Sequence, residues 1–284
     1  MKQMTGLNDD RDARRVGGSA GWRGLVADTA ACLVFYSRLP VPQRFLPDGG
    51  KAAPDFGTMI RALPLAGAII GLGGGLAMAA GLSLGFGALP SAVLAVAALT
   101  MITGALHEDG WADTADGLFG GRTRERRLEI MRDSRIGAFG AAALCLGLLL
   151  RVALLAELAS RAPALSVAAA VVVAAAISRT AGLLPLATLP PAKPDGAGAS
   201  AGRPDATALS IAALLCLMLI IAAGFGADVG IGSATFGALL ALAAAWGTAR
   251  LARAKLGGHT GDIAGAAQQA AEMAFFLGML AMTT

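Results

Sequence analysis

The chain has 284 residues, of which 56% are hydrophobic and 15% charged, with a formal net charge of +4. Ordinary soluble domains contain about 45–50% apolar and about 25% charged residues, so this composition argues against a soluble single domain and excludes a disordered chain. The three cysteines each stand alone in an apolar stretch, so they offer neither a disulfide framework nor a CxxC metal site.

The amino-terminal region is polar and lacks the apolar core of a cleaved signal peptide. We therefore expect residues 1–20 to form a disordered cytoplasmic tail. Residues 22–39 are moderately apolar and helical in pattern, and arginines flank them on both sides. This pattern predicts a helix that lies at the membrane interface or re-enters, and that ends at Pro40 and Pro42.

Long stretches with almost no charge follow. Residues 63–106 contain no charged residue, 206–249 contain only Asp228, and 263–284 contain only Glu272. A membrane helix needs about 20 apolar residues, and runs of Ala, Leu and Gly without alternation exclude a membrane β-barrel. The predicted fold class is all-α: a polytopic integral membrane helical bundle, with residues 21–284 as a single membrane-embedded domain. We predict seven spanning helices, at 58–82, 88–106, 137–160, 164–187, 207–225, 231–254 and 262–283.

Basic residues mark alternate connections between these helices. The connections near 83–90 and 226–230 carry no Lys or Arg, whereas 107–136 carries six arginines. Since basic connections stay in the cytoplasm, this alternation predicts their location there and a carboxyl terminus outside. The same rule accounts for the positive net charge, so we expect a lipid bilayer and no nucleic acid as partner.

The most unusual segment is 107–117, HEDGWADTADG, at the cytoplasmic end of the second predicted spanning helix. At about 100° per residue, Asp109, Asp113 and Asp116 fall within roughly 60° of one helical face. Mg²⁺ would remove the repulsion among them and leave positions for substrate phosphates, so we predict a Mg²⁺ site. The alternative is a set of interfacial acids or helix caps. For His107, a general base, a metal ligand and an interfacial hydrogen-bonding residue stay open.

Six arginines follow the acidic segment. Guanidinium groups bind phosphate oxygens bidentately, so arginines beside a metal indicate a polyphosphate substrate. The better candidates for substrate contact are Arg132 and Arg135, which flank Asp133-Ser134 just before a predicted membrane helix. Membrane orientation alone accounts for the other four, Arg122, Arg124, Arg126 and Arg127.

Two further connections are predicted to face the same side. Lys193 lies in a Pro/Gly-rich turn and could supply a point charge. Asp262 lies at the start of the last helix, and either Asp262 or Thr260 could cap it. Alternatively, the free backbone N–H groups at this helix start could bind a phosphate.

Three ionisable residues fall within the predicted spans: Arg151, Arg179 and Glu272. Charges inside a membrane are costly unless they are paired or face a cavity, so we expect all three to face the bundle interior. Arg151 is expected to pair with a carboxylate that the sequence does not identify.

The acidic segment, followed by RRLEIMRDSRIGAFG at 126–140, resembles the signature of the cobalamin synthase family, the adenosylcobinamide-GDP ribazoletransferases. The family's acidic motif reads close to H-x-D-G-x-A-D-T-x-D-G. The resemblance continues in FYSRLPVP at 35–42, RALPLAGAIIG at 61–71, KPDGAGA at 193–199 and HTGDIAGA at 259–266. It implies a Mg²⁺-dependent integral membrane enzyme that joins adenosylcobinamide-GDP to α-ribazole and releases GMP.

The resemblance also implies residue roles. Asp109, Asp113 and Asp116 would hold Mg²⁺ against the pyrophosphate. Arg132 and Arg135 would stabilise the transferring phosphate and the leaving GMP.

The attacking group would be a ribose hydroxyl of α-ribazole, and Asp116 or His107 would accept its proton. Asp133, Lys193 and Asp262 would orient the substrate. The expected location is the bacterial cytoplasmic (inner) membrane with the site on the cytoplasmic side. The oligomeric state is left open, with a homo-oligomer among the alternatives.

Two alternative classes of protein stay open. A CDP-alcohol phosphatidyltransferase also uses clustered aspartates at a membrane surface, but its usual acidic pattern differs from this one. A transporter would need an ion path through the bilayer, whereas these acids gather at one face.

Overall fold

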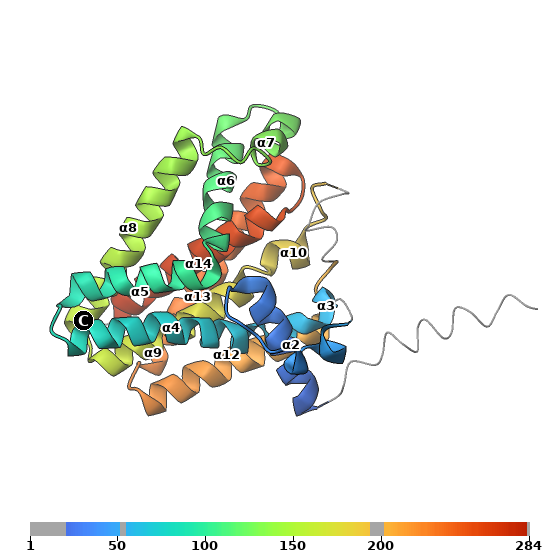
Figure 1. Cartoon of the computed structure of the whole chain (residues 1–284). Coiled ribbons are helices and arrows are strands. Elements are labelled where there is room, and N and C mark those ends of the chain that lie inside the picture. Colours follow the sequence, from blue (N-terminus) through green and yellow to red (C-terminus); the bar gives the residue numbers. More distant parts are fainter. Residues whose placement is uncertain (1–20, 52–54, 194–201, 283–284) are drawn as a thin grey trace, which may run out of the picture.

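The computed structural model describes residues 21–51, 55–193 and 202–282, so the predicted amino-terminal tail lies outside the described residues. The described chain forms helices joined by short turns, with one isolated β-bridge between Pro191 and His259 (Figure 1). The all-α prediction is therefore confirmed.

The amino-terminal part is a compact set of short helices. It contains α2 (Trp22–Tyr36), the 3₁₀ helices η1 (Gln43–Phe45) and η2 (Pro47–Gly50), then α3 (Phe56–Met59) and η3 (Ile60–Ala62). The 15 residues of α2 end before Pro40, as predicted, and α2 is not among the helices long enough to span a membrane. An ion pair of 2.6 Å between Arg61 and Asp28 ties α2 to the start of the bundle.

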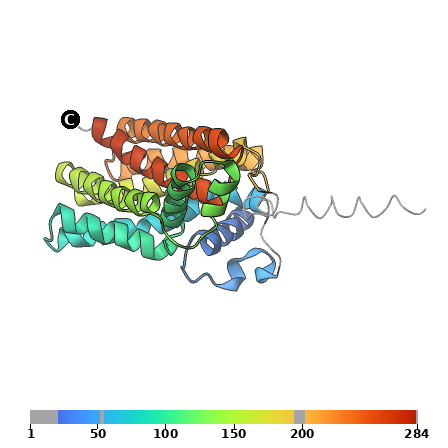
Figure 2. The same ribbon diagram turned by 90° about the horizontal axis from the view of Figure 1, so that it is seen from above.

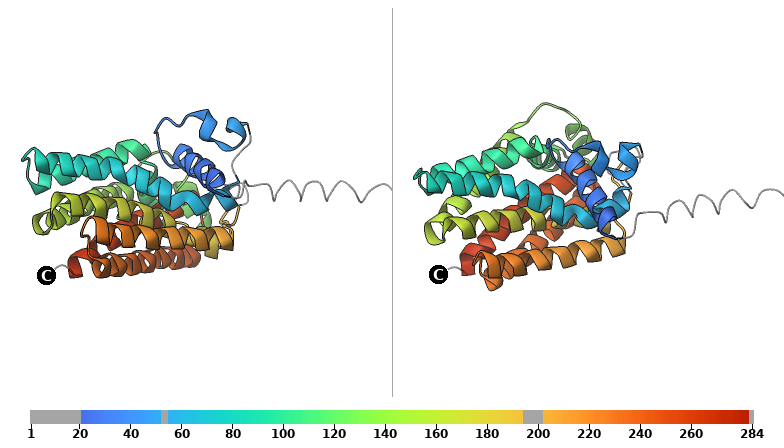
Figure 3. Two further views of the ribbon diagram at one scale, coloured as in Figure 1. Left: turned by 90° about the horizontal axis from the view of Figure 1, so that it is seen from below. Right: turned by 60° about the horizontal axis from the view of Figure 1, so that its bottom comes forward.

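The remaining helices form the bundle. They are α4 (Leu63–Ser83), α5 (Ala88–Thr103), α6 (Leu106–Gly120), α7 (Arg124–Ile130), α8 (Ala138–Arg161), α9 (Ala164–Ala181), α10 (Leu184–Thr188), α12 (Ala206–Gly226), α13 (Ile231–Leu256) and α14 (Gly261–Met282). The long helices run side by side in the views of Figures 2 and 3.

Within the described residues, five helical segments are long and apolar enough to cross a membrane: Phe56–Ser83, Ala138–Arg161, Ala164–Thr188, Ala206–Gly226 and Ile231–Leu256. The count reaches six if the bent pair α5 and α6 is one span. The polytopic fold is therefore confirmed, but the predicted number of seven is not. The reason is that α5 has only 16 residues, and that α14 contains Gln268, Gln269 and Glu272.

Small residues bring the helices into close contact. Gly67, Gly71 and Gly75 recur every fourth residue on α4 and face α9; a Cβ at Gly67 would come within 2.7 Å of the Ala175 carbonyl oxygen. In lipid, helices associate through such close backbone packing because no hydrophobic force drives them together. Gly278 of α14 meets Gly237 of α13 in the same manner. These contacts hold the scaffold on which the polar residues are placed.

The two ends of the bundle differ in charge. One cavity is lined jointly by the carboxyl ends of α8 and α14 and by the starts of α9 and α13, which places the connections poor in basic residues at one end. The carboxyl terminus lies at this end in Figure 1. The helices α7 and α10 lie toward the opposite end. The basic connections therefore gather away from the carboxyl terminus, as the charge pattern predicts.

Candidate active site

The acidic segment forms a helix of its own. Gly104 and Ala105 both adopt left-handed backbone conformations, with φ of 63° and 59°, and α6 turns 90° away from α5. The acidic segment therefore does not extend the apolar helix before it. The turn sets α6 across the direction of α4 and α5 (Figure 1) and outside the five spanning segments.

The three aspartates occupy one uninterrupted helix, as the periodicity predicts, but they differ in burial. Asp109 is exposed, Asp113 is half-buried and Asp116 is buried. Burial and the charges of Asp109, Asp262 and Asp116 raise the pKa of Asp113 to about 7. Asp113 thus lies at the centre of an acidic row that is completed by Asp262 from α14.

Asp116 forms hydrogen bonds to the protein backbone through both of its carboxylate oxygens. Its two carboxylate oxygens accept backbone N–H groups of Gly137, at 2.7 Å, and Gly140, at 2.8 Å. Among the described residues, no hydrogen bond engages the side chain of Asp109 or Asp113, and no three acidic, His or Cys side chains form a ready-made metal site. Both carboxylate oxygens of Asp116 therefore contact the start of α8. The binding of Mg²⁺ by the three aspartates stays a prediction.

This arrangement makes Gly140 sensitive to substitution. A Cβ at Gly140 would overlap the Asp116 carboxylate, whereas a Cβ at Gly232 of α13 would meet nothing within 4 Å. Overpacking of this kind costs about 1–3 kcal/mol. We expect Gly140→Ala to lower the thermal midpoint of unfolding in detergent by several degrees, with Gly232→Ala as the matched control. Equal midpoints for both variants would show that the Asp116 contact does not constrain α8.

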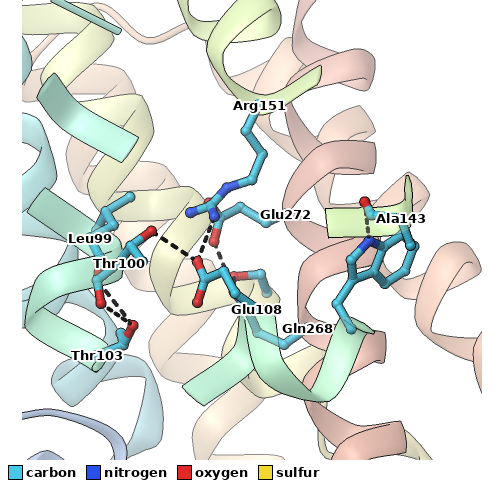
Figure 4. A network of polar contacts seen from close by, with 10 residues as sticks. Leu99, Thr100, Thr103, Glu108, Ala143, Arg151, Gln268 and Glu272 are labelled. Carbon is cyan, nitrogen blue, oxygen red and sulfur yellow. Dashed lines mark hydrogen bonds and ion pairs between the residues drawn. The ribbon is translucent and has the colours of Figure 1, made fainter. Parts of the chain in front are cut away.

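A buried charge cluster anchors the other end of α6 (Figure 4). Arg151 of α8 contacts Glu108 at 2.7 Å and Glu272 of α14 at 2.8 Å, and all three side chains are at most 7% exposed. Gln268 donates to the second Glu272 oxygen at 2.8 Å. The predicted interior location of Arg151 and its carboxylate partner are confirmed. Glu108 was missed because it is adjacent to the acidic row in sequence, while its side chain turns into the bundle.

Between these two anchors, Trp111 gives a third contact to α8. Its indole Nε1 donates to the Ala143 carbonyl oxygen at 2.8 Å. Asp116, Trp111 and Glu108 therefore meet α8 at successively later residues, and α6 runs antiparallel to α8.

Two of the arginines assigned to membrane orientation have structural contacts. Arg124 donates to the carbonyl oxygens of Leu256, at 2.7 Å, and Ala192, at 2.5 Å. Arg127 donates to the Lys255 carbonyl oxygen at 3.1 Å. These bonds tie α7 to the end of α13 and to the connection after α10.

Arg132, Asp133 and Arg135 lie together on the short connection before α8. Arg135 binds Asp133 at 2.7 Å, and this hydrogen-bonded contact lowers the pKa of Asp133 to about 2. The Arg135 side chain is 87% exposed. With Arg126 and the buried Asp116, these residues line a pocket of about 670 Å³, which we call the arginine pocket.

The other predicted residues come from distant segments. Lys193 donates to the Leu128 carbonyl oxygen at 3.1 Å, and burial, followed by the charge of Arg132, lowers its pKa. Thr260, not Asp262, caps α14, since its hydroxyl accepts the Ile263 N–H. Asp262 accepts a hydrogen bond from the Thr260 hydroxyl at 3.2 Å, and burial raises its pKa.

The arginine pocket adjoins Asp116, at one end of the acidic row, and a second cavity adjoins Asp109 at the other end. The second cavity measures about 240 Å³ and is lined by residues of α2, α3, α6, α9, α10 and α14. We call it the aromatic cavity; its lining includes Phe35, Tyr36, Phe56, His107, Asp109, Arg179, Asp262, Ala264 and Gln268. His107 stacks parallel to Tyr36, and burial together with Arg179 and Arg151 lowers its pKa well below the usual value. The imidazole is therefore neutral. Sequence inspection missed the aromatic residues because they are far apart along the chain.

These helices and this site define a polytopic helical membrane protein with a polar site at the basic end of the bundle. Comparison with known proteins narrows the class. A family model described as cobalamin-5-phosphate synthase matches residues 28–280. The chain belongs to this family, and it is a transferase of cobalamin biosynthesis. This membership decides against the phosphatidyltransferase and transporter alternatives.

Curated relatives share most of their length with this chain. The adenosylcobinamide-GDP ribazoletransferase of Azorhizobium caulinodans is 48% identical over 90% of this chain and 96% of the relative. The enzyme of the same name from Xanthobacter autotrophicus is also 48% identical, over 90% and 96%. That of Rhizobium meliloti is 45% identical over 92% and 98%. No solved structure matches the chain.

Proposed function

We propose that the chain transfers the adenosylcobinamide phosphate group from adenosylcobinamide-GDP to a ribose hydroxyl of α-ribazole. The products are adenosylcobalamin and GMP. A bond forms between the ribose oxygen and the phosphorus next to cobinamide, the pyrophosphate bond to GMP breaks, and the hydroxyl proton is released. The observation that carries this proposal is the acidic row, which ends in the aromatic cavity on one side and in the arginine pocket on the other.

The residues present fit a Mg²⁺ ion whose coordination is completed by substrate oxygens. Mg²⁺ keeps several waters and is usually held by one or two carboxylates together with substrate phosphates. Asp109 and Asp113 supply such carboxylates, and the mutual repulsion at Asp113 favours a cation there. Bound between them, Mg²⁺ would neutralise the phosphate oxygens of the donor. Asp116 supports this site indirectly, by fixing the start of α8 beside it.

The arginines bind and orient the leaving group in this proposal. Arg132 and Arg135 line the arginine pocket at the Asp116 end of the row, where they hold the phosphate of the departing GMP. Lys193, which is within electrostatic reach of Arg132 and Asp262, adds positive charge near the donor phosphates, and Asp133 holds Arg135 in place.

The acceptor hydroxyl is oriented at the opposite end. His107 is neutral there and can accept a hydrogen bond from this hydroxyl, although its low pKa makes it a weak base. Asp262 lines the same cavity and orients the acceptor. We place the whole site on the cytoplasmic side of the bacterial inner membrane, in agreement with the basic connections around it.

The experiment that tests this function is product analysis. Full-length protein in lipid nanodiscs receives adenosylcobinamide-GDP and α-ribazole, with Mg²⁺ or with excess EDTA, and the products are identified by mass spectrometry. We expect equal amounts of adenosylcobalamin and GMP with Mg²⁺ and neither product with EDTA. Folded protein that gives no product with Mg²⁺ would refute the proposed function, and equal turnover in EDTA would refute its metal dependence.

If Arg135 binds substrate and the arginines near it do not, their substitutions should differ in effect on catalysis. We expect Arg135→Ala to lower kcat/KM for adenosylcobinamide-GDP about 10–100-fold, since a charge-assisted hydrogen bond contributes about 1.5–3 kcal/mol. Arg122→Ala, also on an exposed side chain, is the matched control and should change it less than twofold. Arg124→Ala should also be milder in catalysis than Arg135→Ala, but it should lower stability because its two backbone contacts are lost. Steady-state kinetics and thermal unfolding measure these effects, and a reversed order in kcat/KM would contradict the assignment.

A further inference from the structure

The aromatic cavity differs in chemistry from a phosphate site. Three rings from α2 and α3 lie edge to face: Phe35 with Tyr36 at 4.7 Å between centroids, and Phe35 with Phe56 at 5.6 Å. Tyr36 and His107 are parallel to within 5° at 6.0 Å. Two acidic residues, Asp109 and Asp262, also line the cavity and would repel an anion. Aromatic rings with a few polar groups are typical of sites for small planar ligands.

Two buried polar side chains in the cavity wall have atoms without a hydrogen-bond partner in the described part of the chain. Arg179 is 4% exposed; among the described residues its Nη1 donates to the Ala175 carbonyl oxygen of its own helix, and its Nε has no partner. Gln268 is 2% exposed, and its Oε1 finds no partner among the residues that the structure describes. Buried polar groups are normally hydrogen-bonded, so the wall has unused donor and acceptor capacity next to the cavity.

The charge balance shows which kind of ligand fits. Arg179 lies close enough to Arg151, Glu108 and Glu272 for their charges to act on it. The two arginines and two glutamates cancel in formal charge. Arg179 therefore offers hydrogen-bond donors without an uncompensated positive charge, which favours an uncharged ligand over an anion.

If the phosphoryl group is transferred in line, the acceptor and the leaving nucleotide must occupy different cavities. The attacking and leaving oxygens lie on opposite sides of the transferred phosphorus. The arginine pocket adjoins Asp116 and suits the charged leaving nucleotide, so the acceptor must approach from the Asp109 end of the row. That end is the aromatic cavity.

We infer that the aromatic cavity binds the uncharged heterocyclic base of the acceptor nucleoside. The base lies against Tyr36, and Arg179 and Gln268 provide its hydrogen bonds. This inference rests on the proposed function, whose acceptor is α-ribazole, and it deepens that function by assigning the site that selects the acceptor.

The test fills the cavity without removing a charge. Ala264 of α14 is half-buried and lines the cavity, so Ala264→Leu takes up space that the base needs. Ala213→Leu, on an exposed position of α12, is the matched control. We expect Ala264→Leu to raise KM for α-ribazole at least tenfold, to change KM for adenosylcobinamide-GDP less than twofold, and to weaken binding of α-ribazole alone in equilibrium dialysis. If Ala264→Leu does not fold, Tyr36→Leu replaces it in the test, because this substitution removes the ring against which the base lies.

The outcomes separate this inference from the proposed function. Wild-type turnover with unchanged KM for α-ribazole in both variants would overturn the cavity assignment and leave the function intact. A raised KM for adenosylcobinamide-GDP would also overturn it, because the cavity would then hold the donor's guanosine. If the wild type gives no product, the proposed function fails, and equilibrium dialysis decides the cavity: binding of α-ribazole that Ala264→Leu removes supports the assignment, and its absence overturns it.

Discussion

Asp113→Asn is expected to lower turnover about a thousandfold or more while the protein still folds and inserts into the membrane. The amide keeps the shape of the side chain but loses the charge that holds Mg²⁺, and a metal contributes several kcal/mol to stabilising phosphate charge. Folding should be retained because, among the described residues, no hydrogen bond engages this side chain. Substitution should even relieve repulsion from Asp109, Asp262 and Asp116. Single-turnover product formation at saturating substrate measures the effect.

The control for this variant is Asp228→Asn. Asp228 is exposed and lies in the connection between α12 and α13, and its left-handed backbone, with φ of 51°, also suits asparagine. We expect its turnover to match the wild type. Wild-type turnover in Asp113→Asn would refute a metal at the centre of the acidic row, and a raised Mg²⁺ requirement with residual turnover would support it.

Arg151→Met should have the largest effect on stability. Removing the cation leaves Glu108 and Glu272 buried without their partner, and breaking a buried ion pair in this way costs about 3–5 kcal/mol. Arg161→Met is the matched control on the same helix. Its ion pair with Glu157 is about half exposed, and such pairs contribute about 0–1 kcal/mol. Unfolding by denaturant in mixed micelles compares the two variants.

A triple variant tests whether charge or packing causes the loss. Combining Arg151→Met with Glu108→Gln and Glu272→Gln removes all three charges while the volumes stay similar. We expect it to recover part of the stability that Arg151→Met loses. If the triple variant is as unstable as the single one, the cost arises from packing, and the charge interpretation is wrong.

Periodicity and composition predicted much of the scaffold. Most predicted helices differ from the observed ones by only a few residues at their ends, because Gly, Pro and charged residues mark where apolar runs stop. The sequence also placed Asp109, Asp113 and Asp116 on one helix and Arg151 against a carboxylate. These features depend on local spacing and on the cost of an unpaired charge in a membrane, both of which can be read from the chain.

Other features depend on contacts that local spacing does not encode. Gly104 is a typical helix-ending residue after α5, but alanine is not a residue type that signals the left-handed conformation found next at position 105. The engagement of Asp116 depends on glycines at 137 and 140, more than twenty residues away. The aromatic cavity combines residues from six helices. Similarly, the polar residues of α14 reduce its hydropathy because they serve the buried charge cluster.

The three contacts between α6 and α8 also determine how firmly the acidic row is held. Asp116, Trp111 and Glu108 bind α8 at Gly137 and Gly140, at Ala143 and at Arg151, over roughly 21 Å at 1.5 Å per residue. An opening between these two helices would have to break all three contacts together. Asp109 and Asp113 lie on the same helix, so their position relative to α8 is fixed from both ends of α6.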